Sequence, residues 1–145
     1  MSSKWASIIA FVVLVLAIFG LMVKHSLFAN NLIAIAVQIL AVLLMLWARL
    51  TFGLRSFHAS AGPTEGGLIT TGPYRLLRHP IYSAILYFLW AGALSHLSIV
   101  SFLLAVLATG AIAVRIVAEE RLLVKLYPEY TSYAARTKRV IPFVF

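Results

Sequence analysis

The residues that could do chemistry gather in two short segments of the C-terminal half. The first runs from Gly66 to Tyr82 and holds two arginines, two tyrosines and a histidine close to Pro80. A reverse turn followed by a helix start explains the prolines, because proline suits the first helical position. It does not explain so many polar side chains at one apolar helix entry. Polar groups at such a place are usually functional when the helix lies in a membrane.

The second segment, Arg115 to Glu120, carries two of the four acidic residues in the chain. Arg115 and Glu119 are four residues apart and share a helix face, where an ordinary surface ion pair is worth about 0.3–0.5 kcal/mol. Glu119 and Glu120 repel each other, so a cation is expected beside them. A cationic ligand, Arg78 or Arg121 would each serve, and the residues alone leave these options open.

Other chemistries have little support in the sequence. The chain has no cysteine, which excludes disulfides, thiolate metal sites and cysteine nucleophiles. No metal-ligand spacing is present, so no metal is expected. His25 and His96 are expected at the membrane interface, and His58 in a solvated loop. Arg49 ends an apolar run, and we interpret it mainly as an anchor that reaches the headgroups.

The elements that must position these residues are membrane helices. Of the 145 residues, 63% are hydrophobic and only 11% are charged, and the mean hydropathy is +1.01. A soluble domain of this size needs more polar surface, so lipid must be the solvent for much of the chain. The net charge of +8 then indicates cations that hold helix ends at an anionic leaflet, and no nucleic-acid partner is expected.

We predict one all-α domain over residues 1–145, a polytopic bundle of about four transmembrane helices. The helices are expected at residues 5–23, 32–50, 81–94 and 97–118, with a loop at 51–79 and an interfacial, partly helical tail at 119–145. The third helix has only 14 residues, about 21 Å at helical rise against a hydrocarbon core of about 30 Å. Irregular backbone at membrane depth survives only when it is buried or lines a cavity. A cavity is therefore expected at this helix entry.

The distribution of cations predicts the orientation. Eleven of the twelve lysines and arginines fall at one end of the predicted helices, and Lys24 alone falls at the other. Positive residues favour the cytoplasmic side, so both termini are expected in the cytoplasm, at the plasma (inner) membrane. Residues 5–23 are read as a retained span, since they are too long for an ordinary signal-peptide core. Tryptophans mark the expected aromatic belts at Trp5, Trp47 and Trp90.

Several features together resemble a known family. Arg-His-Pro-Ile-Tyr at 78–82, a helical hairpin, the Glu119–Glu120 pair and the aromatic tail from Tyr127 to Phe143 resemble the isoprenylcysteine carboxyl methyltransferases. These belong to a wider set of membrane methyltransferases that includes phospholipid methyltransferases. The resemblance covers about residues 66–143. It implies a helical bundle that binds S-adenosylmethionine in a pocket closed by the tail.

The resemblance also implies roles for individual residues. Arg115 would contact the methyl acceptor. The cofactor would be bound by Gly66, Gly67, Leu68, Ile69, Tyr74, His79, Pro80, Ile81, Tyr82 and Glu119.

The expected chemistry suits these residues. Methyl transfer from a sulfonium is an in-line displacement that consumes positive charge, so it needs positioning and a dry cavity more than covalent help. A carboxylate acceptor needs only an orienting cation such as Arg115, whereas an amine or hydroxyl would need a base, for which His79 is the local candidate. We therefore expect a methyltransferase that acts on a lipid-like or isoprenoid small molecule, with carboxyl O-methylation favoured.

Two other functions remain open at this stage. One is a membrane reductase on a related scaffold, whose NADPH 2′-phosphate would need a cluster of cations. The other is a non-catalytic module that binds membrane lipids or a partner helix. The cations available for such a phosphate site are Arg75, Arg78, Arg136 and Arg139.

Overall fold

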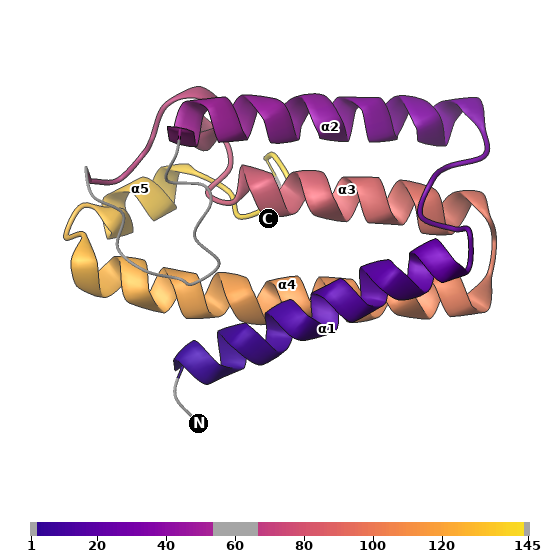
Figure 1. The fold of residues 1–145 in the computed structure, drawn as a ribbon. Helices are drawn as coiled ribbons and strands as arrows, with labels where there is room; N and C mark the ends of the chain where they lie inside the picture. The colour runs from indigo at the N-terminus through magenta and orange to yellow at the C-terminus, as the bar shows by residue number, and fades with distance from the viewer. Residues whose placement is uncertain (1–2, 54–66, 144–145) are drawn as a thin grey trace.

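The computed structural model describes residues 3–53 and 67–143, and this part of the chain folds into a helical bundle without a β-strand (Figure 1). The elements are α1 (Ser3–Val23), α2 (Leu32–Phe52), a short 3-10 helix η2 (Gly72–Arg75), α3 (Pro80–Ser95), α4 (Ile99–Leu126) and α5 (Tyr130–Arg136). The all-α membrane bundle expected from the sequence is confirmed.

The long helices have the length and composition of membrane spans. In the described residues, α1, α2 and α4 are each long and apolar enough to cross a bilayer. The fourth apolar helix, α3, has 16 residues, about 24 Å at helical rise, and so falls short of a hydrocarbon core of about 30 Å. The protein is thus a membrane protein whose described part has three helices long enough for a full span and one shorter apolar helix.

Local sequence explains where the helices begin and how far they run. Asn31 caps α2, because its side-chain oxygen accepts a hydrogen bond of 2.9 Å from the backbone N–H of Ala34. Ser98 occupies the same position before α4. Pro80 begins α3, as expected of a proline at a first helical position. At its other end α4 continues to Leu126, well beyond the expected end at residue 118.

The helices lie in the order α2, α3, α4 and α1 across the bundle (Figure 1). The packing between α1 and α4 uses small side chains that let the helix backbones approach closely. They include Ala10 and Ala17 on α1 and Ala105 and Ala108 on α4, all buried. This packing fixes which turn of α1 faces which turn of α4.

One end of the bundle is fastened by Gln38 of α2. Its amide donates hydrogen bonds to the backbone oxygens of Leu27 (2.8 Å) and Phe88 (3.1 Å) and accepts one from the N–H of Ala29 (3.0 Å). The connection between α1 and α2 comes so close to α3 here that a Cβ on Gly92 would lie 2.3 Å from the backbone oxygen of Leu27. The Gln38 side chain therefore links α2 to α3 and to the connection between α1 and α2.

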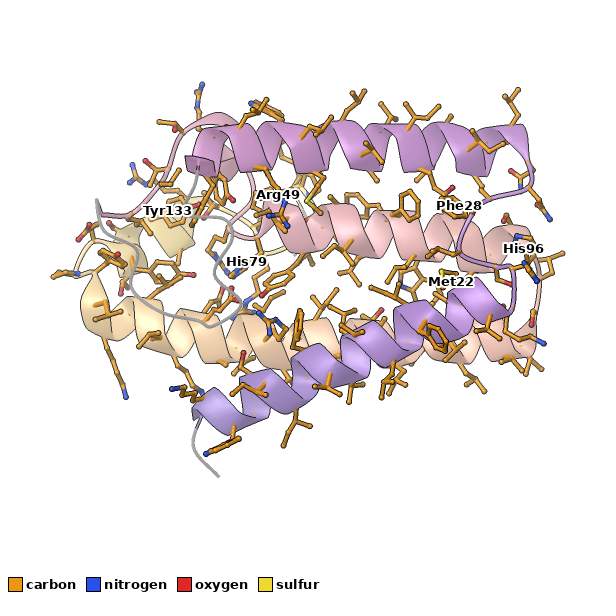
Figure 2. All side chains as sticks on the ribbon, viewed as in Figure 1. Met22, Phe28, Arg49, His79, His96 and Tyr133 are labelled. Carbon is orange, nitrogen blue, oxygen red and sulfur yellow. The ribbon has the colours of Figure 1, made fainter. Side chains whose placement is uncertain are left out.

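The opposite end carries the polar groups. Figure 2 shows Phe28 and His96 at the first end and Arg49, His79 and Tyr133 at the other. The start of α1, residues 67–79 and α5 also lie toward the end that holds His79 (Figure 1). The segments singled out in the sequence are thus brought to one end of the bundle.

The tryptophans expected in the aromatic belts differ in their surroundings. Trp5 and Trp47 are more than half exposed, as belt residues would be. Trp90 is instead part-buried, and its indole N–H donates a hydrogen bond of 3.0 Å to the Thr109 hydroxyl. Its ring also meets the edge of Phe102 at 5.4 Å. Trp90 therefore joins α3 to α4, because a buried indole N–H needs a partner.

Candidate active site

The entry to α3 is fixed to the end of α2 through Gly72. Gly72 has a positive φ of 56°, and a Cβ there would lie 2.5 Å from the Thr51 hydroxyl oxygen. Only glycine fits a backbone that is both left-handed and this close to a neighbour. The next two residues, Pro73 and Tyr74, are buried. The Tyr74 ring packs against Phe52 of α2 with 5.7 Å between ring centroids.

Past this turn, the chain runs beside the C-terminal tail. The backbone N–H of Arg78 donates to the oxygen of Lys138 (2.7 Å), and that of His79 to the oxygen of Arg139 (3.1 Å). The Lys138 N–H donates back to the oxygen of Leu76 (3.1 Å). These bonds hold residues 138–139 against the start of α3. Only 6% of His79 is exposed as a result.

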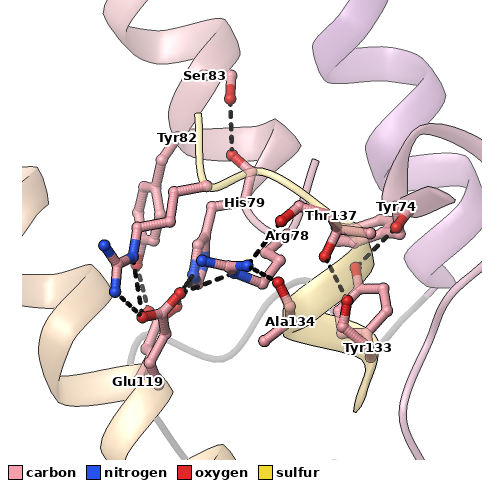
Figure 3. A network of polar contacts seen from close by, with 11 residues as sticks. Tyr74, Arg78, His79, Tyr82, Ser83, Glu119, Tyr133, Ala134 and Thr137 are labelled. Carbon is pink, nitrogen blue, oxygen red and sulfur yellow. Dashed lines mark hydrogen bonds and ion pairs between the residues drawn. The ribbon is translucent and has the colours of Figure 1, made fainter. Parts of the chain in front are cut away.

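Glu119 lies in a cluster with three other polar side chains, which we call the Glu119 cluster: Glu119, Arg115, Tyr82 and His79. The Tyr82 hydroxyl donates to the Glu119 carboxylate (Figure 3) and accepts a hydrogen bond of 2.9 Å from Nε of Arg115. Arg115 Nη2 is 3.8 Å from the same carboxylate, and His79 Nδ1 is 3.7 Å from its other oxygen. Side chains from α3 and α4 thus meet at one carboxylate.

Glu120 has a separate set of partners. Arg78 Nε lies 3.0 Å from one carboxylate oxygen, and Arg139 contacts the other at 3.0 Å and 2.9 Å. His79 Nε2 is 3.3 Å from Glu120. Arg121 is exposed. Of the two alternatives Arg78 and Arg121, Arg78 is the one that pairs with Glu120, and Arg139 joins it.

Arg78 also binds the tail directly. Its Nη1 donates to the backbone oxygens of Ala134 (2.5 Å) and Thr137 (2.7 Å), as Figure 3 shows. The Tyr133 hydroxyl donates to the backbone oxygen of Tyr74 (2.7 Å). We call these contacts, with those of Glu120, the tail latch. The tail is partly helical as expected, and these contacts hold it against the end of the bundle.

Tyr74 and Tyr133, which lie outside the membrane helices, stay protonated near neutral pH. Burial raises the pKa of Tyr133 to about 12. Burial also raises the pKa of Tyr74, with smaller contributions from Tyr133 and the Glu119 carboxylate and an opposing one from Arg49. The Tyr74 hydroxyl therefore lies within electrostatic range of both Arg49 and Glu119.

An open hollow of about 500 Å³ adjoins this region. Its lining residues come from the end of α2 and the segment before η2: Thr51, Phe52, Gly53, Leu68, Ile69, Thr70 and Thr71. Phe52 contacts Tyr74, so the hollow neighbours the segment that leads to His79. Pockets for small molecules typically measure about 300–1,000 Å³, and this hollow falls within that range.

Comparison with known proteins adds the family. A family model described as phospholipid methyltransferase matches residues 28–130, more than half of the chain. The chain belongs to the phospholipid methyltransferase family. This is a family of membrane methyltransferases related to the isoprenylcysteine carboxyl methyltransferases, so the resemblance seen in the sequence is confirmed at that level. The match includes α2, which the sequence motifs did not reach, and leaves α1 outside.

The chain is also similar to part of one individual protein. The cobalt-zinc-cadmium resistance protein CzcN of Cupriavidus metallidurans is 35% identical over 83 residues, which make up 57% of this chain and 38% of that protein. The chain therefore spans less than two fifths of the length of this relative. No solved structure matches the chain. In the described residues, no group of three or more histidines and acids is placed to hold a metal ion.

Within this family fold, the residues expected to bind cofactor fall into two places. Tyr82 and Glu119 meet in the Glu119 cluster together with His79 and Arg115, while Leu68 and Ile69 line the hollow. Gly67 is exposed, and Gly66 lies outside the described residues. Tyr74 lies between the two places along the chain. Pro80 and Ile81 lie between His79 and Tyr82 of the cluster, with Pro80 buried and Ile81 half-buried.

Sequence reasoning missed the parts that four residues play at this end of the bundle. Arg139 was noted only as a possible phosphate contact, yet it pairs with Glu120. Thr51 and Phe52 border the hollow. Phe11 of α1 lies with its ring 5.2 Å from the Arg115 guanidinium carbon. The cationic character of Arg139 was visible, but an apolar phenylalanine in a membrane span carries no signal of its own.

Proposed function

We propose that this member of the phospholipid methyltransferase family transfers the methyl group of S-adenosylmethionine to the carboxylate of a lipid-like or isoprenoid small molecule. The observation that carries the proposal is the Glu119 cluster. It puts a carboxylate and a buried guanidinium on one face of α4, joined by the Tyr82 hydroxyl. The carboxylate of Glu119 suits a cationic cofactor, and the guanidinium of Arg115 suits an anionic acceptor.

The residues present fit the cofactor. S-adenosylmethionine supplies an electrophilic methyl group on a sulfonium, together with a cationic α-amino group. Glu119 is a carboxylate with a side chain 22% exposed, so a cation can approach it while water is largely excluded. The hollow beside Leu68 and Ile69 has a volume suitable for a nucleotide-sized group. We assign the cationic part to Glu119 and the remainder to the hollow and Tyr74.

Arg115 is the residue we assign to the acceptor. Its side chain is 7% exposed and lies 3.8 Å from the Glu119 carboxylate. A buried guanidinium in a membrane protein is stabilised by anionic groups, and a second one, the acceptor carboxylate, can join Glu119 there. A planar guanidinium can bind a carboxylate through two parallel hydrogen bonds, which orients the oxygen that attacks the methyl group. The positive charge of Arg115 would also stabilise a carboxylate that has lost its water on entering the site.

The surroundings of His79 favour a carboxylate over an amine acceptor. Both ring nitrogens face acids, with Nδ1 toward Glu119 and Nε2 toward Glu120. A histidine held between two carboxylates is well placed to orient them. With both ring nitrogens directed at these carboxylates, neither is directed at an incoming amine or hydroxyl. An amine acceptor, which the description of the family brings to mind, remains the second candidate, with His79 as its base.

The arrangement of the cations argues against a nicotinamide reductase. A 2′-phosphate needs several clustered cations, and two of the four considered, Arg78 and Arg139, pair with Glu120. Arg75 and Arg136 are exposed. Anionic lipid headgroups are a more suitable partner for such exposed cations.

A binding measurement and a chemical measurement test the proposal. Purified protein is titrated calorimetrically with S-adenosylmethionine and with NADPH, and saturable binding of the first alone is expected. Radiolabelled methyl transfer into a total membrane lipid extract then reports the reaction. A carboxyl ester releases its label as methanol in mild alkali, whereas an N-methyl group does not. Label that survives alkali would indicate an amine acceptor instead of a carboxylate. A protein that does not bind S-adenosylmethionine would overturn the proposal.

A further inference from the structure

The guanidinium of Arg115 is enclosed by side chains and backbone from three helices. Besides Tyr82 of α3 and Glu119 of α4, it contacts α1. Arg115 Nη1 donates a hydrogen bond of 3.2 Å to the backbone oxygen of Ser7. The ring of Phe11 lies over the guanidinium, 5.2 Å from its central carbon to the ring centroid. The first helix is therefore part of the Arg115 environment, although it lies outside the part of the chain that the family model matches.

The two contacts from α1 come from one place on that helix. Ser7 and Phe11 are four residues apart, so they lie one above the other on the same face. The packing of Ala10 and Ala17 against α4 holds this face toward Arg115. An aromatic ring attracts a guanidinium through its quadrupole, and the attraction is stronger where water is excluded. The register of α1 against α4 thus brings the Phe11 ring and the Ser7 backbone oxygen to the same cation.

These contacts fix the orientation of the guanidinium plane. One N–H edge is tied to Tyr82 and another to Ser7, and the Phe11 ring restricts rotation of the plane. The Nη2 edge then points toward Glu119, 3.8 Å from its carboxylate. That is the side to which the proposed function assigns the cofactor. A carboxylate bound to this edge would be held beside the methyl donor.

Phe11 also forms the outer boundary of the Arg115 site. The residue is 41% exposed although it contacts a buried cation. Its ring therefore separates Arg115 from the surface of the bundle on the α1 side. Since α1 is a membrane span, that surface faces hydrocarbon.

We propose that Phe11 is a positioning residue for the methyl acceptor, which it serves by holding the Arg115 guanidinium in the plane that binds the acceptor carboxylate. The inference rests on the proposed function. Phe11 acts through Arg115 and makes no contact with the cofactor. Its replacement should therefore change how the acceptor is used and leave the affinity for S-adenosylmethionine unaltered.

The test compares two phenylalanines on the same helix. Phe11→Leu removes the ring and keeps an apolar side chain, and Phe11→Tyr keeps the ring. Phe19→Leu is the matched control, because Phe19 is 57% exposed and lies two turns further along α1. Each variant is titrated with S-adenosylmethionine, and the rate of methyl transfer is measured over a dilution series of total membrane lipid extract. The series gives a half-saturating amount of extract without knowledge of the acceptor.

We expect Phe11→Leu to lower the rate at limiting extract by about tenfold, equivalent to about 1.4 kcal/mol, while the Kd for S-adenosylmethionine stays within about twofold. Phe11→Tyr should keep most of the activity, and Phe19→Leu should match the wild type. Equal rates for Phe11→Leu and Phe19→Leu would overturn the inference. So would a parallel loss of cofactor affinity, or a Phe11→Tyr variant as impaired as Phe11→Leu. A wild-type protein that binds no S-adenosylmethionine would instead sink the proposed function itself.

Discussion

Replacement of Glu119 by glutamine isolates the charge of one carboxylate in the candidate site. A glutamine has nearly the same shape and keeps an oxygen that can accept the hydrogen bond from the Tyr82 hydroxyl. The variant is therefore expected to fold. The variant loses the negative charge. In the wild type this charge faces Arg115 and His79, and under the proposed function it also faces the cationic cofactor.

The structure sets the size of the expected effect. The Glu119 side chain is 22% exposed, so the contact lies between a surface ion pair and a fully buried one. A hydrogen bond to a charged group is worth about 1.5–3 kcal/mol, and each 1.4 kcal/mol corresponds to about tenfold in affinity. Glu119→Gln should therefore raise the Kd for S-adenosylmethionine by more than about tenfold.

A second ligand distinguishes loss of charge from general damage to the pocket. S-adenosylhomocysteine keeps the nucleoside and the α-amino group but has a neutral thioether in place of the sulfonium. If Glu119 faces the sulfonium, calorimetric titration of Glu119→Gln should show a large loss for S-adenosylmethionine and a small one for S-adenosylhomocysteine. If it faces the α-amino group, both ligands should lose equally.

The neighbouring acid provides the matched control. Glu120→Gln makes the same chemical change one residue away, but Glu120 pairs with Arg78 and Arg139 of the tail latch. Any effect through the tail should weaken the two ligands to a similar degree. An unchanged Kd in Glu119→Gln, for both ligands, would refute the reasoning and leave Glu119 as a structural partner of Tyr82 and Arg115.

Three further predictions follow from the same arrangement. Arg115→Ala should leave the cofactor Kd within about threefold and lower turnover about 100-fold or more, with poor rescue by lysine; a parallel loss of cofactor binding in titration would show that Arg115 serves only to hold Glu119. Glu120→Gln should speed tryptic cleavage in the tail, followed by mass spectrometry, since Arg139 loses its charged partner; wild-type cleavage rates would mean that the backbone bonds alone hold the tail. Cysteines placed at Ser60 and at Ser132, which is exposed, should resist a membrane-impermeant reagent in intact cells, because most cations lie at that end; labelling of either from outside would reverse the topology.

The sequence was most informative where hydropathy and helix geometry decide the outcome. Long apolar runs predicted the membrane helices, and the short run before Leu94 indicated that α3 would fall short of a full span. The four-residue spacing of Arg115 and Glu119 predicted their shared face. In each case the relevant contacts are local, so the order of the residues along the chain is sufficient.

The sequence was least informative where long side chains bind backbone oxygens far along the chain. Arg78 reaches the oxygens of Ala134 and Thr137, and these contacts depend on no particular side chain at the acceptor residue. The charged and aromatic pattern of the tail therefore predicted a partly helical interfacial segment but not these contacts. The hydrogen bond from Trp90 to Thr109 was not predicted either, since Thr109 lies on another helix.

The two adjacent acids show how one helix can serve two purposes. Successive residues of an α-helix point about 100° apart, so Glu119 faces Tyr82 and Arg115 while Glu120 faces the tail. Each carboxylate has cations of its own, which offsets the repulsion that their adjacency in the sequence implies. His79 lies between them, with one ring nitrogen toward each acid. A tail held by Glu120 is thereby kept next to Glu119, the carboxylate we assign to the cofactor. The position of the tail can therefore influence Glu119 through the His79 imidazole.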